Sequence, residues 1–105
     1  MDPTRWRLDG QLALVTGGSA GIGLAIAREL LGFGAEVTIV GRDAAALERA
    51  RAELQDDFPD SRLHALVADV ADDEERREII DWVEDRGIGL NILVNNARPA
   101  GAYLQ

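Results

Sequence analysis

The stretch Leu12-Ala13-Leu14-Val15-Thr16-Gly17-Gly18-Ser19-Ala20-Gly21-Ile22-Gly23 decides the fold of this chain. Its apolar residues lead directly into glycines, as a buried parallel strand does. Glycine permits positive φ and lets a phosphate come close to the backbone, because no Cβ intervenes. A helix that follows directs its free N–H groups and the positive end of its dipole at the same place. The segment therefore predicts a strand, a tight turn and a helix N-terminus suited to an anion.

The spacing of the glycines distinguishes this turn from two well-known phosphate-binding motifs. Gly17, Gly21 and Gly23 follow the pattern Gly-xxx-Gly-x-Gly, which differs from G-x-G-x-x-G. A P-loop is excluded, because Leu24 and Ala25 stand where Lys and Ser or Thr are required. Taken alone, the glycines also fit a strand-to-helix turn that binds no ligand.

Outward from this turn, the chain alternates between apolar runs and amphipathic segments. Strands are predicted at Leu12–Val15, Glu36–Val40, Leu63–Val67 and Leu90–Val94. Such an alternation implies right-handed crossovers and a parallel sheet. We expect one domain over residues 1–105, in which residues 98–105 form an atypical C-terminal tail.

Three helices are predicted between the strands from the spacing of apolar side chains. The apolar positions are Ile22, Ile26, Leu30 and Phe33 in the first, Leu47, Ala50, Leu54 and Phe58 in the second, and Ile79, Ile80 and Val83, expected to point inward, in the third. Asp43 is expected to cap the second helix, and Asp72 with Glu75 forms a capping-box-like start of the third. Helix ends are expected at Gly32 with Gly34, at Pro59 and at Gly87.

The composition is that of an ordinary globular domain and argues against several classes. Hydrophobic residues make up 47% and charged residues 29% of the 105 residues. The formal net charge of −8 argues against nucleic acid as a partner. No cysteine is present, which excludes disulfides and cysteine-based metal sites. Neither a signal peptide nor a membrane-spanning apolar run is recognised, so a cytoplasmic location is expected.

Three features could be mistaken for functional sites. His64 is alone on a predicted strand, and a partly exposed histidine is favoured there over a ligand or a general base. The acidic run 72–75 is interpreted as charge at a helix N-terminus rather than as a metal site. Trp6 and Trp82 are interpreted as packing residues. No metal site is therefore predicted.

Three separated motifs together resemble the short-chain dehydrogenase/reductase family. They are Thr16-Gly17-xxx-Gly21-Ile22-Gly23 after the first strand, Asp69-Val70 at the end of the third, and Asn95-Asn96-Ala97 after the fourth. The resemblance runs from about Leu8 to Ala97, and residues 5–10 and 90–94 look more narrowly like tropinone-reductase-type members. It implies a Rossmann-type three-layer αβα fold whose parallel sheet has the order 3-2-1-4 and is truncated after the fourth strand.

The resemblance also implies a dinucleotide-binding site on these motifs. The residues expected around the pyrophosphate and the adjacent ribose are Gly17, Ser19, Gly21, Ile22 and Gly23. Asp69 would accept a hydrogen bond from the adenine amino group, and the backbone of Val70 would meet the ring. Asn96 and Ala97 would pass beside the ribose, whereas Asn95 is expected to tie neighbouring strands together.

The tip of the second strand favours NADP(H) over NAD(H). NAD-dependent sites place a carboxylate there that binds both ribose hydroxyls and would repel a 2′-phosphate. Gly41 occupies the tip instead, and Arg42 follows with a planar guanidinium suited to phosphate. Asp43 lies near the position expected of a ribose-binding acid, but we interpret it as the helix cap. Ala20 stands where many NADP-binding members of the family carry a second basic residue.

The catalytic residues that the resemblance implies are missing from this chain. The family uses a tyrosine and a lysine four residues later, with a serine upstream and an asparagine. Tyr103 is the only tyrosine, two residues follow it, and the chain contains no lysine. We therefore expect the chain alone to be inactive. Arg98 stands where the family pattern has glycine, which leads to the hypothesis of a truncation or frame shift near this codon.

Three functions are compatible with the sequence. The first is the NADP(H)-binding half of an oxidoreductase that acts on carbonyl or alcohol substrates. The second is a non-catalytic dinucleotide-binding or assembly module. The third, an acidic flavodoxin-like receiver, is disfavoured because proteins resembling that family need a lysine. We also expect a homo-oligomer, formed through the exposed fourth strand or through uncovered helix faces.

Overall fold

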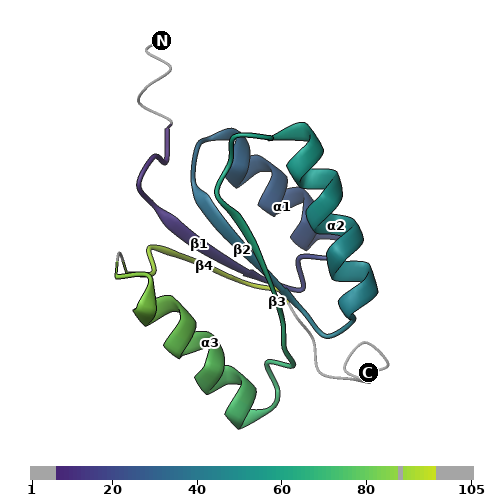
Figure 1. The fold of residues 1–105 in the computed structure, drawn as a ribbon, viewed down its shortest axis with the longest axis vertical. Helices are drawn as coiled ribbons and strands as arrows, with labels where there is room; N and C mark the ends of the chain where they lie inside the picture. The colour runs from purple at the N-terminus through teal and green to yellow at the C-terminus, as the bar shows by residue number, and fades with distance from the viewer. Residues whose placement is uncertain (1–6, 88, 97–105) are drawn as a thin grey trace.

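The computed structural model describes residues 7–87 and 89–96. The elements, in chain order, are β1 (Leu12–Thr16), α1 (Gly21–Gly32), β2 (Glu36–Gly41), α2 (Ala44–Asp57), β3 (Leu63–Val67), α3 (Asp73–Asp85) and β4 (Ile92–Asn95). The strands form one parallel sheet in the order β3-β2-β1-β4. Helices α1 and α2 cover one face, and α3 lies on the other (Figure 1). The predicted αβα layering and strand order are confirmed, whereas the expected tail at 98–105 lies outside the described residues.

The strand boundaries agree with the predictions to within one residue, except at the start of β4. β3 spans the predicted residues, and β1 and β2 each run one residue further. β4 begins at Ile92, two residues later than predicted. The reason lies in Asn91, whose side-chain oxygen accepts the Leu12 N–H at 2.9 Å while its own N–H donates to the Leu12 carbonyl at 3.0 Å. The Asn91 side chain thus replaces a backbone carbonyl as the acceptor for Leu12, and regular pairing with β1 starts only at Ile92.

The larger core lies between the sheet and helices α1 and α2. Because side chains alternate along a strand, Ala13 and Val15 of β1 face these helices together with Val37 and Ile39 of β2. The helices contribute Ala27, Leu31, Leu47, Ala50 and Leu54, and Phe58 packs against them half-buried. The apolar face predicted for the second helix is therefore confirmed.

The face of helix α1 that is buried differs from the apolar face predicted from the sequence. Its buried residues are Gly23, Ala27 and Leu31, whereas Ile22 is 71% and Phe33 40% exposed. The start of the helix lies too close to the preceding turn for a large side chain. A Cβ added at Gly23 would lie 2.1 Å from the carbonyl oxygen of Gly17. Because the helix start lies so close to the turn, a small residue is required at Gly23. The buried face of α1 is therefore shifted by one residue from the apolar positions found in the sequence.

The second face of the sheet has a smaller core. Its buried residues are Leu14, Val40, Ala68 and Ile79. The prediction that Ile79, Ile80 and Val83 all point inward is wrong for Ile80, which is 55% exposed, while Ile79 is buried and Val83 half-buried. Adjacent residues of a helix point about 100° apart, so a thin contact with the sheet buries only one of the pair.

The start of α3 also differs in part from the expected capping box. Asp72 does cap the helix, because its Oδ1 accepts the Glu75 N–H at 3.0 Å. The reciprocal half of the box is absent, since the Asp72 N–H donates to the carbonyl oxygen of Asp69 at 3.0 Å. The Glu75 side chain instead accepts the N–H of Asp69 at 3.2 Å. The path of the loop before α3 therefore determines that the Glu75 side chain accepts the Asp69 N–H.

A buried carboxylate anchors the C-terminal end of α3 to the sheet. Glu36 at the start of β2 is 5% exposed, and its Oε2 lies 2.8 Å from His64 Nε2 and forms an ion pair with Arg86. The Trp82 ring packs edge-on against His64, with centroids 5.1 Å apart, and beneath Arg86 at 5.4 Å. His64 is partly exposed and Trp82 is a packing residue, as the sequence indicated. Together these side chains join β2, β3 and α3.

Candidate functional site

The glycine turn lies at the carboxyl end of β1, where ligands of parallel α/β sheets bind. Gly17 and Gly21 have φ angles of +68° and +57°, a region that favours glycine. The N–H groups of Gly17 and Gly18 donate to the carbonyl oxygen of Val40 at 2.8 Å and 3.3 Å, so the turn is fastened to the end of β2. Two of the glycines in the motif are thus required by backbone conformation, and Gly23 by close approach.

Helix α1 begins without a side-chain cap. Its N-cap residue is Ala20, which makes no capping hydrogen bond, and its first turn holds no acidic residue. Helix α2, in contrast, is capped by Asp43, and α3 by Asp72. An uncapped N-terminus leaves backbone N–H groups that an anion can accept. Gly21, Ile22 and Gly23, all predicted site residues, form this first turn.

A pocket of about 460 Å³ opens beside the turn. It is lined by Gly17, Ser19, Val40, Gly41, Arg42, Asp43, Ala68, Asp69 and Val70. Three chain segments meet there: the turn after β1, the end of β2 and the loop after β3. The pocket brings together five of the predicted residues, namely Gly17, Ser19, Arg42, Asp69 and Val70. Val40 and Ala68 were not predicted, because their apolar side chains belong to the core and only the fold brings them to the pocket.

Asp43 caps α2, as the sequence predicted, whereas the Arg42 side chain is left unpaired among the described residues. The Oδ1 atom of Asp43 accepts the N–H groups of Ala45 and Ala46 at 3.0 Å and 3.2 Å, so this carboxylate caps α2. Arg42 is exposed and forms no ion pair within the described part of the chain. Arg49 and Arg77 are also unpaired there, but neither lines the pocket. Arg42 is therefore a free cation at the tip of β2.

The end of β4 contacts the glycine turn through Thr16. The Thr16 Oγ1 accepts the Asn96 N–H at 3.0 Å and lies 3.3 Å from the Asn95 Oδ1. The Asn96 side chain donates to the Gly17 carbonyl oxygen at 3.4 Å. Asn95 thus joins neighbouring strands, as expected, and Asn96 supports the turn. Ala97 lies outside the described residues.

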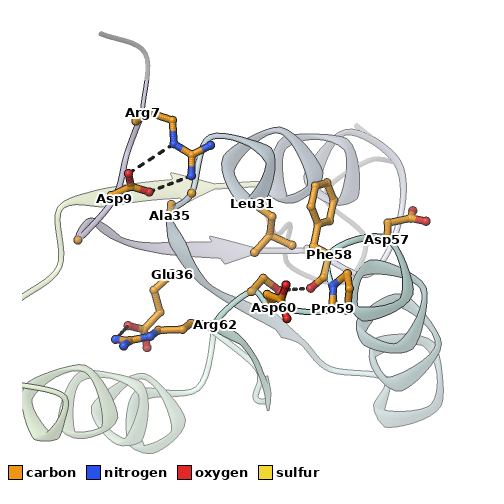
Figure 2. Close-up of a pocket in the computed structure, with 13 residues that line it drawn as sticks. Arg7, Asp9, Leu31, Ala35, Glu36, Asp57, Phe58, Pro59, Asp60 and Arg62 are labelled. Carbon is orange, nitrogen blue, oxygen red and sulfur yellow. Dashed lines mark hydrogen bonds and ion pairs between the residues drawn. The ribbon is translucent and has the colours of Figure 1, made fainter. Parts of the chain in front are cut away.

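A larger cavity of about 700 Å³ lies at the opposite, amino-terminal ends of the strands (Figure 2). Its two arginines are already paired with carboxylates, Arg7 with Asp9 and Arg62 with Glu36. No unpaired cation lines it to attract an anionic ligand, and none of the glycine or Asn-Asn-Ala motifs reaches it. The candidate site therefore stays at the carboxyl ends of the strands.

Two kinds of feature are absent from the residues that the structure describes. No group of three or more His, Asp or Glu side chains is placed to hold a metal ion. The acidic run 72–75 instead begins α3, where Asp72 is the cap. No helix is both long and apolar enough to cross a membrane.

Comparison with known proteins agrees with the motifs and their geometry. The model of the short chain dehydrogenase family matches residues 11–101. This chain belongs to the short-chain dehydrogenase family. A tropinone reductase homolog from Arabidopsis thaliana is 42% identical over 107 residues, which cover 96% of this chain and 34% of that protein. The uncharacterized oxidoreductase DltE of Bacillus subtilis (strain 168) is 41% identical over 91 residues, or 87% of this chain and 34% of DltE.

Solved structures of related oxidoreductases share the fold. An NADPH-bound short chain oxidoreductase from Pseudomonas aeruginosa PAO1, which contains an atypical catalytic center, has a TM-score of 0.84 and 41% identity over 90% of this chain and 37% of that one. L-Sorbose reductase from Gluconobacter frateurii, complexed with NADPH and L-sorbose, has a TM-score of 0.82 and 35% identity over 90% of this chain and 35% of that one. This family member spans about a third of the length of the relatives it matches.

Proposed function

We propose that this chain is the NADP(H)-binding half of a short-chain dehydrogenase/reductase that acts on carbonyl or alcohol substrates. The observation that carries the proposal is Arg42, a free cation lining a pocket that the glycine turn completes. The strand tip beside it, Gly41, holds no carboxylate to repel a phosphate. The two NADPH complexes among the related structures support the same cofactor.

Several groups of the site would match parts of the dinucleotide. The residues that would hold the pyrophosphate and adjacent ribose are Gly17, Ser19, Gly21, Ile22 and Gly23, at the uncapped start of α1. Asp69 would accept from the adenine amino group beside the Val70 backbone, and Asn96 and Ala97 would lie along the second ribose. When bound, the nicotinamide exchanges a hydride with a carbonyl or alcohol carbon.

Arg42 is the residue that would select NADP(H) over NAD(H). A charge-assisted hydrogen bond to the 2′-phosphate contributes about 1.5–3 kcal/mol, equivalent to a roughly ten- to hundredfold preference. Asp43 does not compete for the ribose in this arrangement, because its Oδ1 already holds two N–H groups of α2. NAD(H) is therefore the less favoured cofactor.

Arg42→Ala is expected to weaken NADPH binding about ten- to hundredfold and NADH binding less than about threefold. Titrations followed by reduced-nicotinamide fluorescence measure both constants. Arg49→Ala is the matched control, because it removes an exposed, unpaired arginine from α2, away from the pocket. Equal weakening of both cofactors by Arg42→Ala would show that this side chain does not read the 2′-phosphate. Failure of the unmodified chain to bind either cofactor would overturn the proposed function.

Catalysis would depend on groups that this sequence does not supply. The chain has no lysine, and its one tyrosine, Tyr103, is followed by only two residues. The tyrosine–lysine pair that the family uses for proton transfer is thus absent from the 105 residues. A second candidate function, a non-catalytic dinucleotide-binding or assembly module, would use the same site.

We also propose that a second copy of this chain associates along β4. Within the described residues β4 has one strand neighbour, β1, so one row of its backbone groups is unpaired. Leu93 of this strand is 60% exposed, and its register partner Leu14 places it on the face that α3 covers. Ile80 of α3 adds a second exposed apolar side chain. A symmetric dimer is the commonest way to cover such an edge.

Leu93→Lys is expected to convert the assembly to a monomer. A lysine would place a charge in the proposed apolar contact, whose desolvation costs several kcal/mol. Sedimentation velocity at micromolar concentration measures the change. Val67→Lys on the opposite edge strand, where Val67 is 56% exposed, is the control and should leave the assembly intact. A monomeric unmodified chain would rule out the association. Dissociation by Val67→Lys but not by Leu93→Lys would show that the interface lies along β3 and not along β4.

A further inference from the structure

The first turn of α3 reaches back to the loop that follows β3. The Glu75 Oε1 accepts the N–H of Asp69 at 3.2 Å, and the Arg76 guanidinium donates to the carbonyl oxygen of Val70 at 2.8 Å. Each bond joins a helix side chain to a backbone group six residues earlier. Two consecutive helix residues therefore hold two consecutive residues of the candidate site.

Further bonds restrain the same loop. The Ala68 N–H donates to the Gly41 carbonyl oxygen at 2.9 Å, which fastens the loop to β2. The Ala71 N–H donates to the Asp69 Oδ1 at 2.9 Å, which orients the carboxylate. Within residues 7–87 and 89–96, however, neither the Val70 N–H nor the Asp69 Oδ2 forms a hydrogen bond. One donor and one acceptor are thus left free next to each other in the pocket lining.

A free donor beside a free acceptor is complementary to one edge of adenine. The ring N1 of adenine accepts a hydrogen bond, and its 6-amino group donates one. Such recognition is strong only when the protein groups are already held in place, because ordering a loop during binding costs free energy. The side chains that hold this loop therefore influence how well the adenine is recognised.

We propose that Glu75 and Arg76 are positioning residues for the adenine of the dinucleotide, an inference that rests on the proposed function. Glu75 holds the Asp69 end of the loop and Arg76 the Val70 end, so that the free carboxylate oxygen and the free N–H face one ligand edge together. Neither side chain itself lines the pocket. Both act through the backbone of the loop.

A purely structural role is the alternative that the test must separate. Acidic residues stabilise the first turn of any helix by their interaction with its dipole, and Arg76 also pairs with Asp73. The chain offers matched controls in the same turn. The side chains of Glu74 and Arg77 are exposed and form no hydrogen bond or ion pair within the described residues.

The experiment compares NADP⁺ with 1,N6-etheno-NADP⁺, in which a bridge blocks both the ring N1 and the 6-amino group. Titration calorimetry measures the two dissociation constants for the unmodified chain, Glu75→Ala, Glu75→Gln and Glu74→Ala. We expect the unmodified chain to prefer NADP⁺ about tenfold, since one or two hydrogen bonds are lost with the etheno analogue. Glu75→Ala should lower the preference to about twofold, whereas Glu75→Gln retains an acceptor and should preserve it.

Arg76→Ala should likewise lower the preference, and Arg77→Ala should not. An equal weakening of both nucleotides by Glu75→Ala, or no change in either, would overturn the inference, because a merely structural residue does not distinguish them. If the unmodified chain binds neither nucleotide, the proposed function fails. The support of the loop is then judged by hydrogen exchange, in which the Asp69 amide should exchange faster in Glu75→Ala than in Glu74→Ala. Equal exchange rates would overturn the positioning role as well.

Discussion

Gly23→Ala is expected to destabilise the chain by about 3 kcal/mol, the upper part of the range for inserting a methyl group into a packed site. The new Cβ would lie 2.1 Å from the Gly17 carbonyl oxygen and 2.9 Å from the Asn96 side-chain nitrogen. Neither neighbour can move easily to accommodate the new Cβ, because one is backbone and the other is a hydrogen-bonded amide. Urea unfolding and thermal melting should both show the loss, with a fall in Tm of more than about 10 °C for a domain of this size.

Gly32→Ala is the matched control for this substitution. It lies in the same helix, and its Cβ would meet the Phe58 ring at 3.8 Å, an ordinary contact. Since alanine restricts the unfolded chain more than glycine does, this variant should be stabilised by about 0.5 kcal/mol. A similar loss in both variants would show that the cost is not specific to the close approach at Gly23, and an unchanged Gly23→Ala would refute that close approach.

Arg86→Ala is expected to destabilise the chain by about 2 kcal/mol. Glu36 is 5% exposed, and loss of Arg86 would remove a cation from this buried carboxylate and also the contact above the Trp82 ring. Breaking a buried ion pair costs about 3–5 kcal/mol when the remaining charge is left alone. The expected loss is smaller, because His64 still lies 2.8 Å from the same carboxylate. Urea unfolding followed by tryptophan fluorescence and by circular dichroism measures the loss.

Arg62→Ala provides the comparison, since Arg62 meets the same carboxylate. Its side chain is 78% exposed and its nitrogen lies 3.9 Å from Glu36 Oε1, so the loss should be below about 0.5 kcal/mol. The Arg86 effect should also persist at high salt, because partly buried pairs are screened less than exposed ones. Equal losses for the two arginines would show that the carboxylate is solvated and does not anchor α3.

Most of the fold could be predicted because it depends on patterns that are local in the chain. β3 was predicted to the residue, and Asp43 was identified as the cap of α2, since a cap needs only the two or three residues after it. The glycine turn could be predicted in the same way, because the positive φ angles of Gly17 and Gly21 depend only on the turn itself. The strand order came from the resemblance to a family rather than from periodicity.

Part of the candidate site was predictable and part was not. The motifs and the tip of the second strand together named five of the residues that line the pocket. They did not indicate Glu75 and Arg76, which touch the site only through the backbone of another segment. A pattern in the sequence can identify a helix cap, but it cannot show which of two nearby N–H groups a glutamate will accept. That choice depends on the path of the loop.

The sequence by itself determined the element types, the helix starts and the residues that meet at the glycine turn. Tertiary structure alone decided which residues of α1 and α3 are buried and which charges are paired. Ile22 and Ile80 were expected on apolar faces but are exposed, because the distance between helix and sheet admits Gly23 at one position and only Ile79 at the other. Glu36 acquired its partners from two other elements, β3 and the end of α3. Contacts of this kind depend on distances between elements remote in the chain, and packing, not local preference, sets those distances.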